Sequence, residues 1–321
     1  MTSDPSHEDL LPPAGEAGGP GPFQRRMQRI FLSPEGIRAG WRILIALGLF
    51  MVFITVLSAA LRLVPAIHAM MTQLRTAGVM TPGSLLFSEG LSVAVLLLVG
   101  LVMTRIENRS FEDYGLPGKG ALRKRFWQGA FFGFVMVSLL MGLIAALHGF
   151  EIAGWALGGR DAVRYALLYG LGFLLVGIAE EFSFRGYLQA TLSSGIGFWP
   201  AAAVLAIFFA AGHLGNPGEA KFGALMVAAF GLLAAFSLRR TGNLWFAIGM
   251  HASWDWGETY FYSVPDSGIL ATGHLLKSSF HGPAWLTGGT VGPEGSAFVF
   301  GVLALWAVSL HFLFPPKREP L

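Results

Sequence analysis

The sequence contains no cysteine and few charged residues: Asp, Glu, Lys and Arg make up 13% of its 321 residues, about half the share of an ordinary soluble protein. The lack of cysteine excludes disulfides, thiolate metal ligands, a cysteine nucleophile and lipidation of the chain on cysteine. The low charge, together with 54% hydrophobic residues, excludes a soluble globular protein. Any chemistry must therefore come from histidines, carboxylates or hydroxyls.

The N-terminal segment lacks the features of a secretory signal. It is rich in proline, glycine and acidic residues, and it has neither a basic start nor a short apolar core. We expect residues 1–40 to form a disordered cytoplasmic tail and residues 41–316 to form one transmembrane domain.

Long apolar stretches fill most of the remaining chain, and the mean hydropathy of the whole sequence, polar termini included, is +0.58. A membrane span takes about 17 to 25 such residues. No period of about 20 to 50 residues repeats, which argues against a solenoid or a duplicated transporter half. We predict an all-α, polytopic transmembrane bundle of about eight helices. The apolar stretches are Trp41–Leu61, Ser84–Thr104, Phe126–Leu147, Val163–Leu192, Phe198–His213, Phe222–Leu238, Asn243–Trp256 and Ala297–Phe314.

Basic residues predict the orientation, because Lys and Arg beside membrane spans favour the cytoplasm. With the N-terminus inside, they divide into about 16 cytoplasmic and about 6 outer residues. We therefore expect a multi-pass protein of a prokaryotic plasma membrane with both termini cytoplasmic and a glycine-rich outer loop, residues 257–296. The basic residues form no single patch interleaved with aromatics, so we expect no nucleic-acid partner.

The fourth apolar stretch is interrupted by three charged residues, Glu180, Glu181 and Arg185. Charged side chains are costly at membrane depth, so they indicate a functional site. At about 100° per residue, Glu181 and Arg185 lie about 40° apart on a helix and can pair. Glu180 points about 140° away from Arg185 and stays free. The alternative is a helix that ends near residue 179 and leaves a solvated cluster.

Two later helices carry further ionisable residues: His213, and His251 with Asp255 four positions on. At 1.5 Å per residue, these three and Glu180 lie roughly 12 to 22 Å from the cytoplasmic helix ends, so all four can meet in one intramembrane cavity. Glu89 could line the same cavity. A single membrane histidine is more often a structural hydrogen-bonding group than a base.

These residues form three ordered motifs: Glu180-Glu181-x-x-x-Arg185, Phe209-x-x-x-His213 and His251-x-x-x-Asp255. Together they resemble the motifs of the CAAX prenyl protease and bacteriocin-processing (CPBP) family of intramembrane proteases. The resemblance covers roughly residues 84–256, and it implies a protease domain with its motif core in residues 163–256 and its active site inside the membrane. Residues 109–116 and 288–295 also resemble segments of bacterial members, and we give them no catalytic weight.

The resemblance implies a role for each motif residue. Glu180 and His213 would hold and deprotonate a water, Glu181 and Arg185 would form a supporting pair, and His251 would face the oxyanion. Family members carry Asn or Asp at the position of Asp255.

Asp255 is the ambiguous member, because an ionised carboxylate cannot donate a hydrogen bond to an oxyanion. It must be protonated, orient His251 through the ring N–H, or bind a metal. Glu180, His213, His251 and Asp255 would make a plausible zinc shell, which keeps a metalloprotease open. We favour no cofactor, because the sequence has no His-Glu-x-x-His motif.

The resulting prediction is an intramembrane endopeptidase whose partners are membrane lipid and a peptide or protein substrate, lipidated in some family members. Two alternatives stay open. One is a proton-coupled transporter, which would show repeat symmetry. The other is a catalytically silent membrane chaperone or immunity protein of the same fold. The outer loop, residues 257–296, is long enough to act as a lid.

Overall fold

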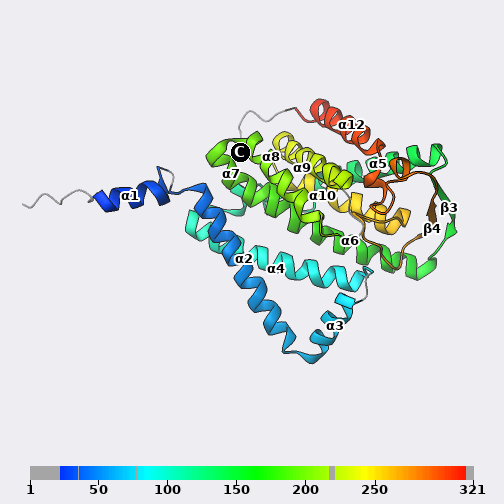
Figure 1. Cartoon of the computed structure of the whole chain (residues 1–321), viewed down its shortest axis with the longest axis horizontal. Helices are drawn as coiled ribbons and strands as arrows, with labels where there is room; N and C mark the ends of the chain where they lie inside the picture. The colour runs from blue at the N-terminus through cyan, green and yellow to red at the C-terminus, as the bar shows by residue number, and fades with distance from the viewer. Residues whose placement is uncertain (1–21, 35, 77–78, 217–220, 316–321) are drawn as a thin grey trace, which may run out of the picture.

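All eight predicted apolar stretches form helices of one bundle (Figure 1). The computed structural model describes residues 22–34, 36–76, 79–216 and 221–315. The prediction of an all-α membrane bundle is confirmed, although the described chain has additional helices. The helices of the eight stretches are α2 (Ala39–Arg62), α4 (Pro82–Glu107), α5 (Lys124–Ala146), α6 (Gly159–Glu181) continued by α7 (Gln189–Ile196), α8 (Phe198–His213), α9 (Lys221–Thr241), α10 (Leu244–Trp256) and α12 (Phe298–Leu313). The additional helices are α1 (Pro22–Phe31), α3 (Pro65–Thr76) and α11 (Ala284–Thr287).

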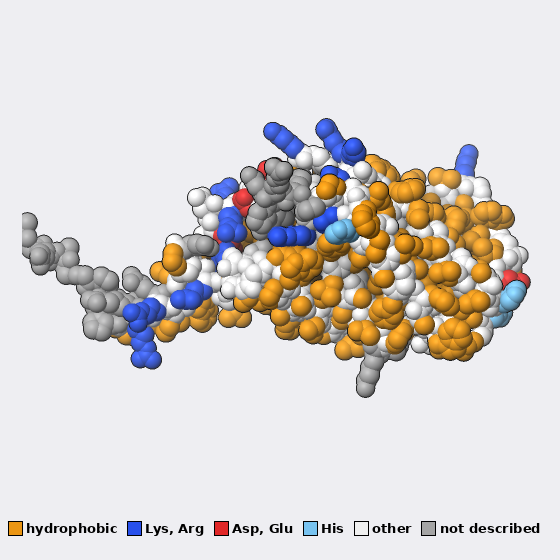
Figure 2. All heavy atoms as spheres, turned by 90° about the horizontal axis from the view of Figure 1, so that it is seen from above, with side chains coloured by type: hydrophobic (Ala, Val, Ile, Leu, Met, Phe, Trp, Pro, Cys, Tyr) orange, Lys and Arg blue, Asp and Glu red, His pale blue; other side chains and the backbone are white. Residues whose placement is uncertain are grey.

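Five helices of the described chain are long and apolar enough to cross a membrane: α2, α4, α5, the continuous segment Gly159–Ile196, and Phe222–Thr241 in α9. Helices α8 and α12 are apolar but shorter. Hydrophobic side chains cover much of the molecular surface, and Lys and Arg lie mainly toward the end from which α1 extends (Figure 2). These features fit an integral membrane protein.

Helix α10 is the central helix, and nearly all of its 13 residues are buried. It runs beside α5 with the two backbones almost in contact. A Cβ atom at Gly129 would lie 1.9 Å from the Phe246 carbonyl oxygen, and one at Gly133 would lie 2.2 Å from that of Met250. Small residues four positions apart allow such close approach of helices in membranes. Helix α6 packs against α10 and α4, which places the glutamate pair of α6 beside His251 of α10.

The outer loop is a folded segment. It contains the π-helical turn η3 (Gly257–Tyr262), strand β4 (Leu276–Phe280), α11 and the 3₁₀ turn η4 (Pro293–Gly295). Strand β4 pairs antiparallel with β3 (Phe150–Trp155), which lies between α5 and α6. This two-stranded sheet was not predicted, and it attaches the loop to the bundle.

The N-terminal part of the described chain extends from the bundle (Figure 1). Residues 1–21 of the predicted tail lie outside the described residues, and from Pro22 the tail forms α1 and a short hairpin of β1 (Leu32–Ser33) and β2 (Gly36–Ile37). Helix α2 is joined to α4 by a buried ion pair between Arg42 and Glu107 at 2.8 Å. Beyond this point α2 runs away from the other helices, and α3 turns back toward the start of α4 (Figure 1).

Candidate active site

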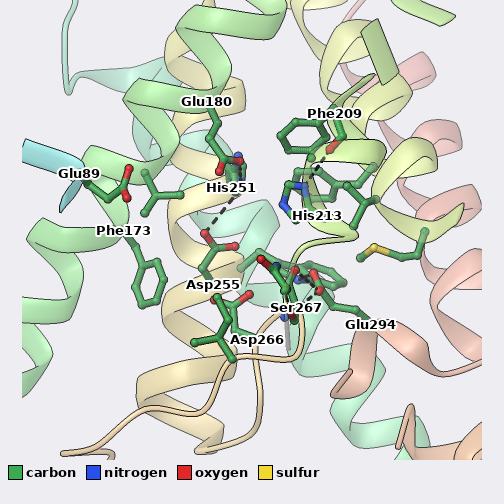
Figure 3. A pocket seen from close by; sticks show the side chains of 18 of the residues that line it. Glu89, Phe173, Glu180, Phe209, His213, His251, Asp255, Asp266, Ser267 and Glu294 are labelled. Atoms are coloured by element: carbon green, nitrogen blue, oxygen red, sulfur yellow. Dashed lines mark hydrogen bonds and ion pairs between the residues drawn. The ribbon is translucent and has the colours of Figure 1, made fainter. Parts of the chain in front are cut away.

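A cavity of about 360 Å³ lies between α4, α6, α8, α9, α10 and the outer loop (Figure 3). The four predicted residues Glu180, His213, His251 and Asp255 all line it, and so does Glu89. Most other lining side chains are apolar. They include Leu85, Phe173, Val176, Phe184, Phe209, Met226, Val227 and Phe230.

The two glutamates at the end of α6 point in different directions, as the helical spacing predicts. The helix does not end near residue 179 but continues through the π-helical turn η2 (Phe182–Leu188) into α7, so the alternative of a solvated cluster is wrong. Glu181 is fully buried, and its Oε1 lies 3.2 Å from Nη1 of Arg185. The Glu180 side chain is 31% exposed and faces the cavity. Its Oε2 is buried and has no hydrogen-bond partner.

His251 is held between three carboxylates. Its Nδ1 lies 2.8 Å from Glu181 Oε1, and its Nε2 lies 3.6 Å from both Glu180 Oε2 and Asp255 Oδ2. Because Glu181 is paired with Arg185 and accepts, Nδ1 carries the proton of this hydrogen bond. The sequence suggested that Asp255 could orient His251 through a ring N–H. In the structure Glu181 accepts from Nδ1, and Asp255 lies nearer Nε2. Nε2 faces Glu180 and the cavity.

His213 lies on α8, across the cavity from Glu180 (Figure 3). Its Nδ1 is 2.9 Å from the Phe209 carbonyl oxygen, one helical turn earlier. A carbonyl only accepts, so Nδ1 is the donor, and Nε2 of the neutral ring is free to accept. The Phe209 ring packs edge-on against His213 and lies beneath the Arg185 guanidinium, 4.1 Å from the ring centroid.

The outer loop contributes residues that sequence reasoning missed. Asp266, Ser267 and Glu294 line the outer end of the cavity, beyond Asp255 (Figure 3). Glu294 accepts hydrogen bonds from Trp254 Nε1 at 3.1 Å and from Ser267 N and Oγ at 3.1 and 2.6 Å. Segment 288–295 resembles family members and could have signalled Glu294, whereas Asp266 carries no motif.

The loop carboxylates lie in a buried, negatively charged environment. Burial raises the pKa of Asp266 well above its usual range, and the charges of Asp255 and Glu294 add to this. One oxygen each of Glu258, Asp266 and Glu294 lies within 4.8 Å of the other two. Among the described residues, these three have potential metal-ligand atoms within 4.8 Å of one another. The four residues considered above for zinc do not come that close together: Glu180, His213, His251 and Asp255.

Residues 162–257 match the family model Rce1-like, type II CAAX prenyl endopeptidase Rce1-like. No curated protein matches the chain. The matched segment begins and ends within one residue of the predicted motif core, residues 163–256, and contains all seven motif residues. It confirms the resemblance to the CAAX prenyl protease family and supports membrane protease activity in general.

Proposed function

We propose that the protein is an intramembrane endopeptidase that hydrolyses a peptide bond of a membrane-associated or lipidated peptide. The observation that carries the proposal is the position of Glu180. Its carboxylate faces a largely apolar cavity with one oxygen free of hydrogen bonds, opposite His213 and 3.6 Å from His251, within the segment that matches the protease family.

In the proposed reaction a water lies between Glu180 and Nε2 of His213. Glu180 takes a proton as the water oxygen attacks the peptide carbonyl carbon, and the tetrahedral intermediate forms. The carbon–nitrogen bond then breaks, and Glu180 returns the proton to the leaving amine. The apolar walls exclude competing water and strengthen the electrostatic interactions inside.

His251 is the proposed donor to the oxyanion. Glu181 holds its Nδ1, which fixes the ring so that Nε2 is directed to the cavity. Nε2 donates when the ring is doubly protonated, and the negative charges of Glu180 and Glu181 beside the ring favour that form. Arg185 acts at a distance from the substrate, through Glu181.

The substitution Glu180→Gln tests this assignment. It removes the base and preserves size and polarity, so we expect turnover to fall by about 10²- to 10⁴-fold while the protein remains folded. The measurement is comparative peptidomics of membranes that contain the wild-type protein or the variant. Peptides released only by the wild type identify the substrates, which then serve in a rate assay in liposomes.

The matched control is Glu151→Gln, an exposed carboxylate on β3. It should release the same peptides as the wild type. Identical peptide profiles for the wild type and Glu180→Gln would remove Glu180 from the chemistry and favour a catalytically silent member of the fold.

A further inference from the structure

A second group of acidic residues lies at the outer end of the cavity, where the outer loop meets the end of α10. Glu258 is in η3, Asp266 follows it in the loop, and Glu294 is in η4. Their carboxylates converge within 4.8 Å. Glu258 is fully buried, Glu294 is 6% exposed, and Asp266 is partly buried. None of them is among the seven motif residues.

Hydrogen bonding satisfies these three carboxylates unequally. Glu294 has three donors, and Asp266 accepts from Thr259 Oγ1 at 3.2 Å. Both oxygens of Glu258 are inaccessible to solvent and have no hydrogen-bond partner. The indole N–H of the nearby Trp254 lies close to Glu258 as well, and its hydrogen bond of 3.1 Å goes to Glu294.

Positive charge is also missing from the group. In the described parts of the chain, no Lys or Arg forms an ion pair with Glu258, Asp266 or Glu294. An isolated buried carboxylate is very costly, and buried charges in proteins are paired or coordinate a metal. The unpartnered Glu258, directed at two other carboxylates, therefore requires a cation or a proton.

We propose that Glu258, Asp266 and Glu294 bind a hard divalent cation, Ca²⁺ or Mg²⁺. Both ions prefer carboxylate, carbonyl and water oxygens, and all three side chains offer oxygen. The site joins η3, the part of the outer loop that continues α10, to two later parts of the same loop. The cation thereby fixes the loop over the outer end of the cavity.

The loop backbone supports this arrangement. Gly292 has a φ of +97°, and a Cβ atom there would lie 2.1 Å from the Pro265 carbonyl oxygen. The Gly268 amide donates to the Val291 carbonyl at 2.8 Å. These contacts hold the segment before Glu294 against the segment around Asp266, so the two ligands are positioned by main chain.

The experiment measures cation binding without reference to peptidase activity, so it is independent of the function proposed above. The full chain is purified in detergent, treated with EDTA and passed into metal-free buffer. Ca²⁺ or Mg²⁺ is then titrated while the thermal midpoint Tm is followed, and bound metal is quantified by elemental analysis. At a concentration about 100-fold above Kd, a single site should raise Tm by about 5 °C.

Two variants make the result specific. Glu258→Gln should abolish the Tm rise and the bound equivalent of metal, whereas Glu151→Gln, on the exposed face of β3, should keep both. If Glu258→Gln fails to fold, Asp266→Asn serves in its place. A preference for one ion identifies which cation the site takes. A wild-type protein that retains no metal and shows no Tm rise would overturn the proposal and indicate that protons neutralise the carboxyls. An equal Tm rise in Glu258→Gln would also overturn it.

Discussion

Replacing Glu181 by Gln would leave Arg185 buried without its counter-charge. The two side chains are 0% and 3% exposed, and Glu181 Oε1 lies 3.2 Å from Nη1 of Arg185. The guanidinium has few other partners. Its Nη2 has no hydrogen-bond partner, and its Nε lies 3.4 Å from the Gly231 carbonyl oxygen. Solvent therefore cannot take over the role of Glu181.

Removing one partner of a buried ion pair costs about 3 to 5 kcal/mol. A glutamine oxygen can still accept from Arg185 and from Nδ1 of His251, so we expect the lower end, about 3 kcal/mol. At about 2 to 4 °C per kcal/mol for a chain of this size, the Tm of Glu181→Gln should fall by about 6 to 12 °C.

The assay is thermal unfolding in detergent micelles, with Glu180→Gln as the matched control. The control changes the neighbouring carboxylate, which is not paired with Arg185, and its Tm should stay near that of the wild type. The double variant Glu181→Gln with Arg185→Met should recover part of the loss, because no uncompensated charge remains. A Glu181→Gln protein that melts at the wild-type temperature would refute the buried pair.

Three further predictions concern packing, topology and Asp255. Gly133→Ala should lower the free energy of unfolding by about 1 to 3 kcal/mol, because the added Cβ would overlap the α10 backbone. The control is Gly142→Ala in the same helix, whose added Cβ meets no atom within 4 Å. Equal Tm values for the two variants would contradict this packing. In this cysteine-free chain, Gly118→Cys should be labelled by a membrane-impermeant thiol reagent from the cytoplasmic side and Ser279→Cys from the opposite side; the reverse pattern would overturn the proposed orientation. Asp255→Asn should keep or raise peptidase activity, since an amide N–H can donate to the oxyanion. A steep loss that added zinc partly restores would instead make Asp255 a metal ligand.

Local sequence determined the helices and the internal pairing of the first motif. Apolar runs long enough to cross a bilayer have few alternatives to a helix, because every backbone polar group must be satisfied within the segment. Glu181 and Arg185 meet because four residues make about one helical turn. The depths of the motif residues also follow from helical rise, and their shared cavity was predicted on that basis.

The partners of these residues across the bundle depended on tertiary structure. Glu181 lies 70 positions from His251, and their hydrogen bond requires the specific approach of α6 to α10. That approach follows from the packing of complete helix faces, including glycines that bring α5 within backbone contact of α10. Periodicity shows which residues share a face but does not say which helix that face meets.

The outer loop was the part least accessible to sequence reasoning. Its glycine-rich composition predicts only a loop, because the path depends on positive φ angles, main-chain contacts and the pairing of β4 with β3. Only the folded chain brings the carboxylates of Glu258, Asp266 and Glu294 within 4.8 Å of one another. The sequence determined the membrane helices and the motif residues they carry. The tertiary structure decided what closes the outer end of the cavity, because the contacts there join segments that lie far apart in the sequence.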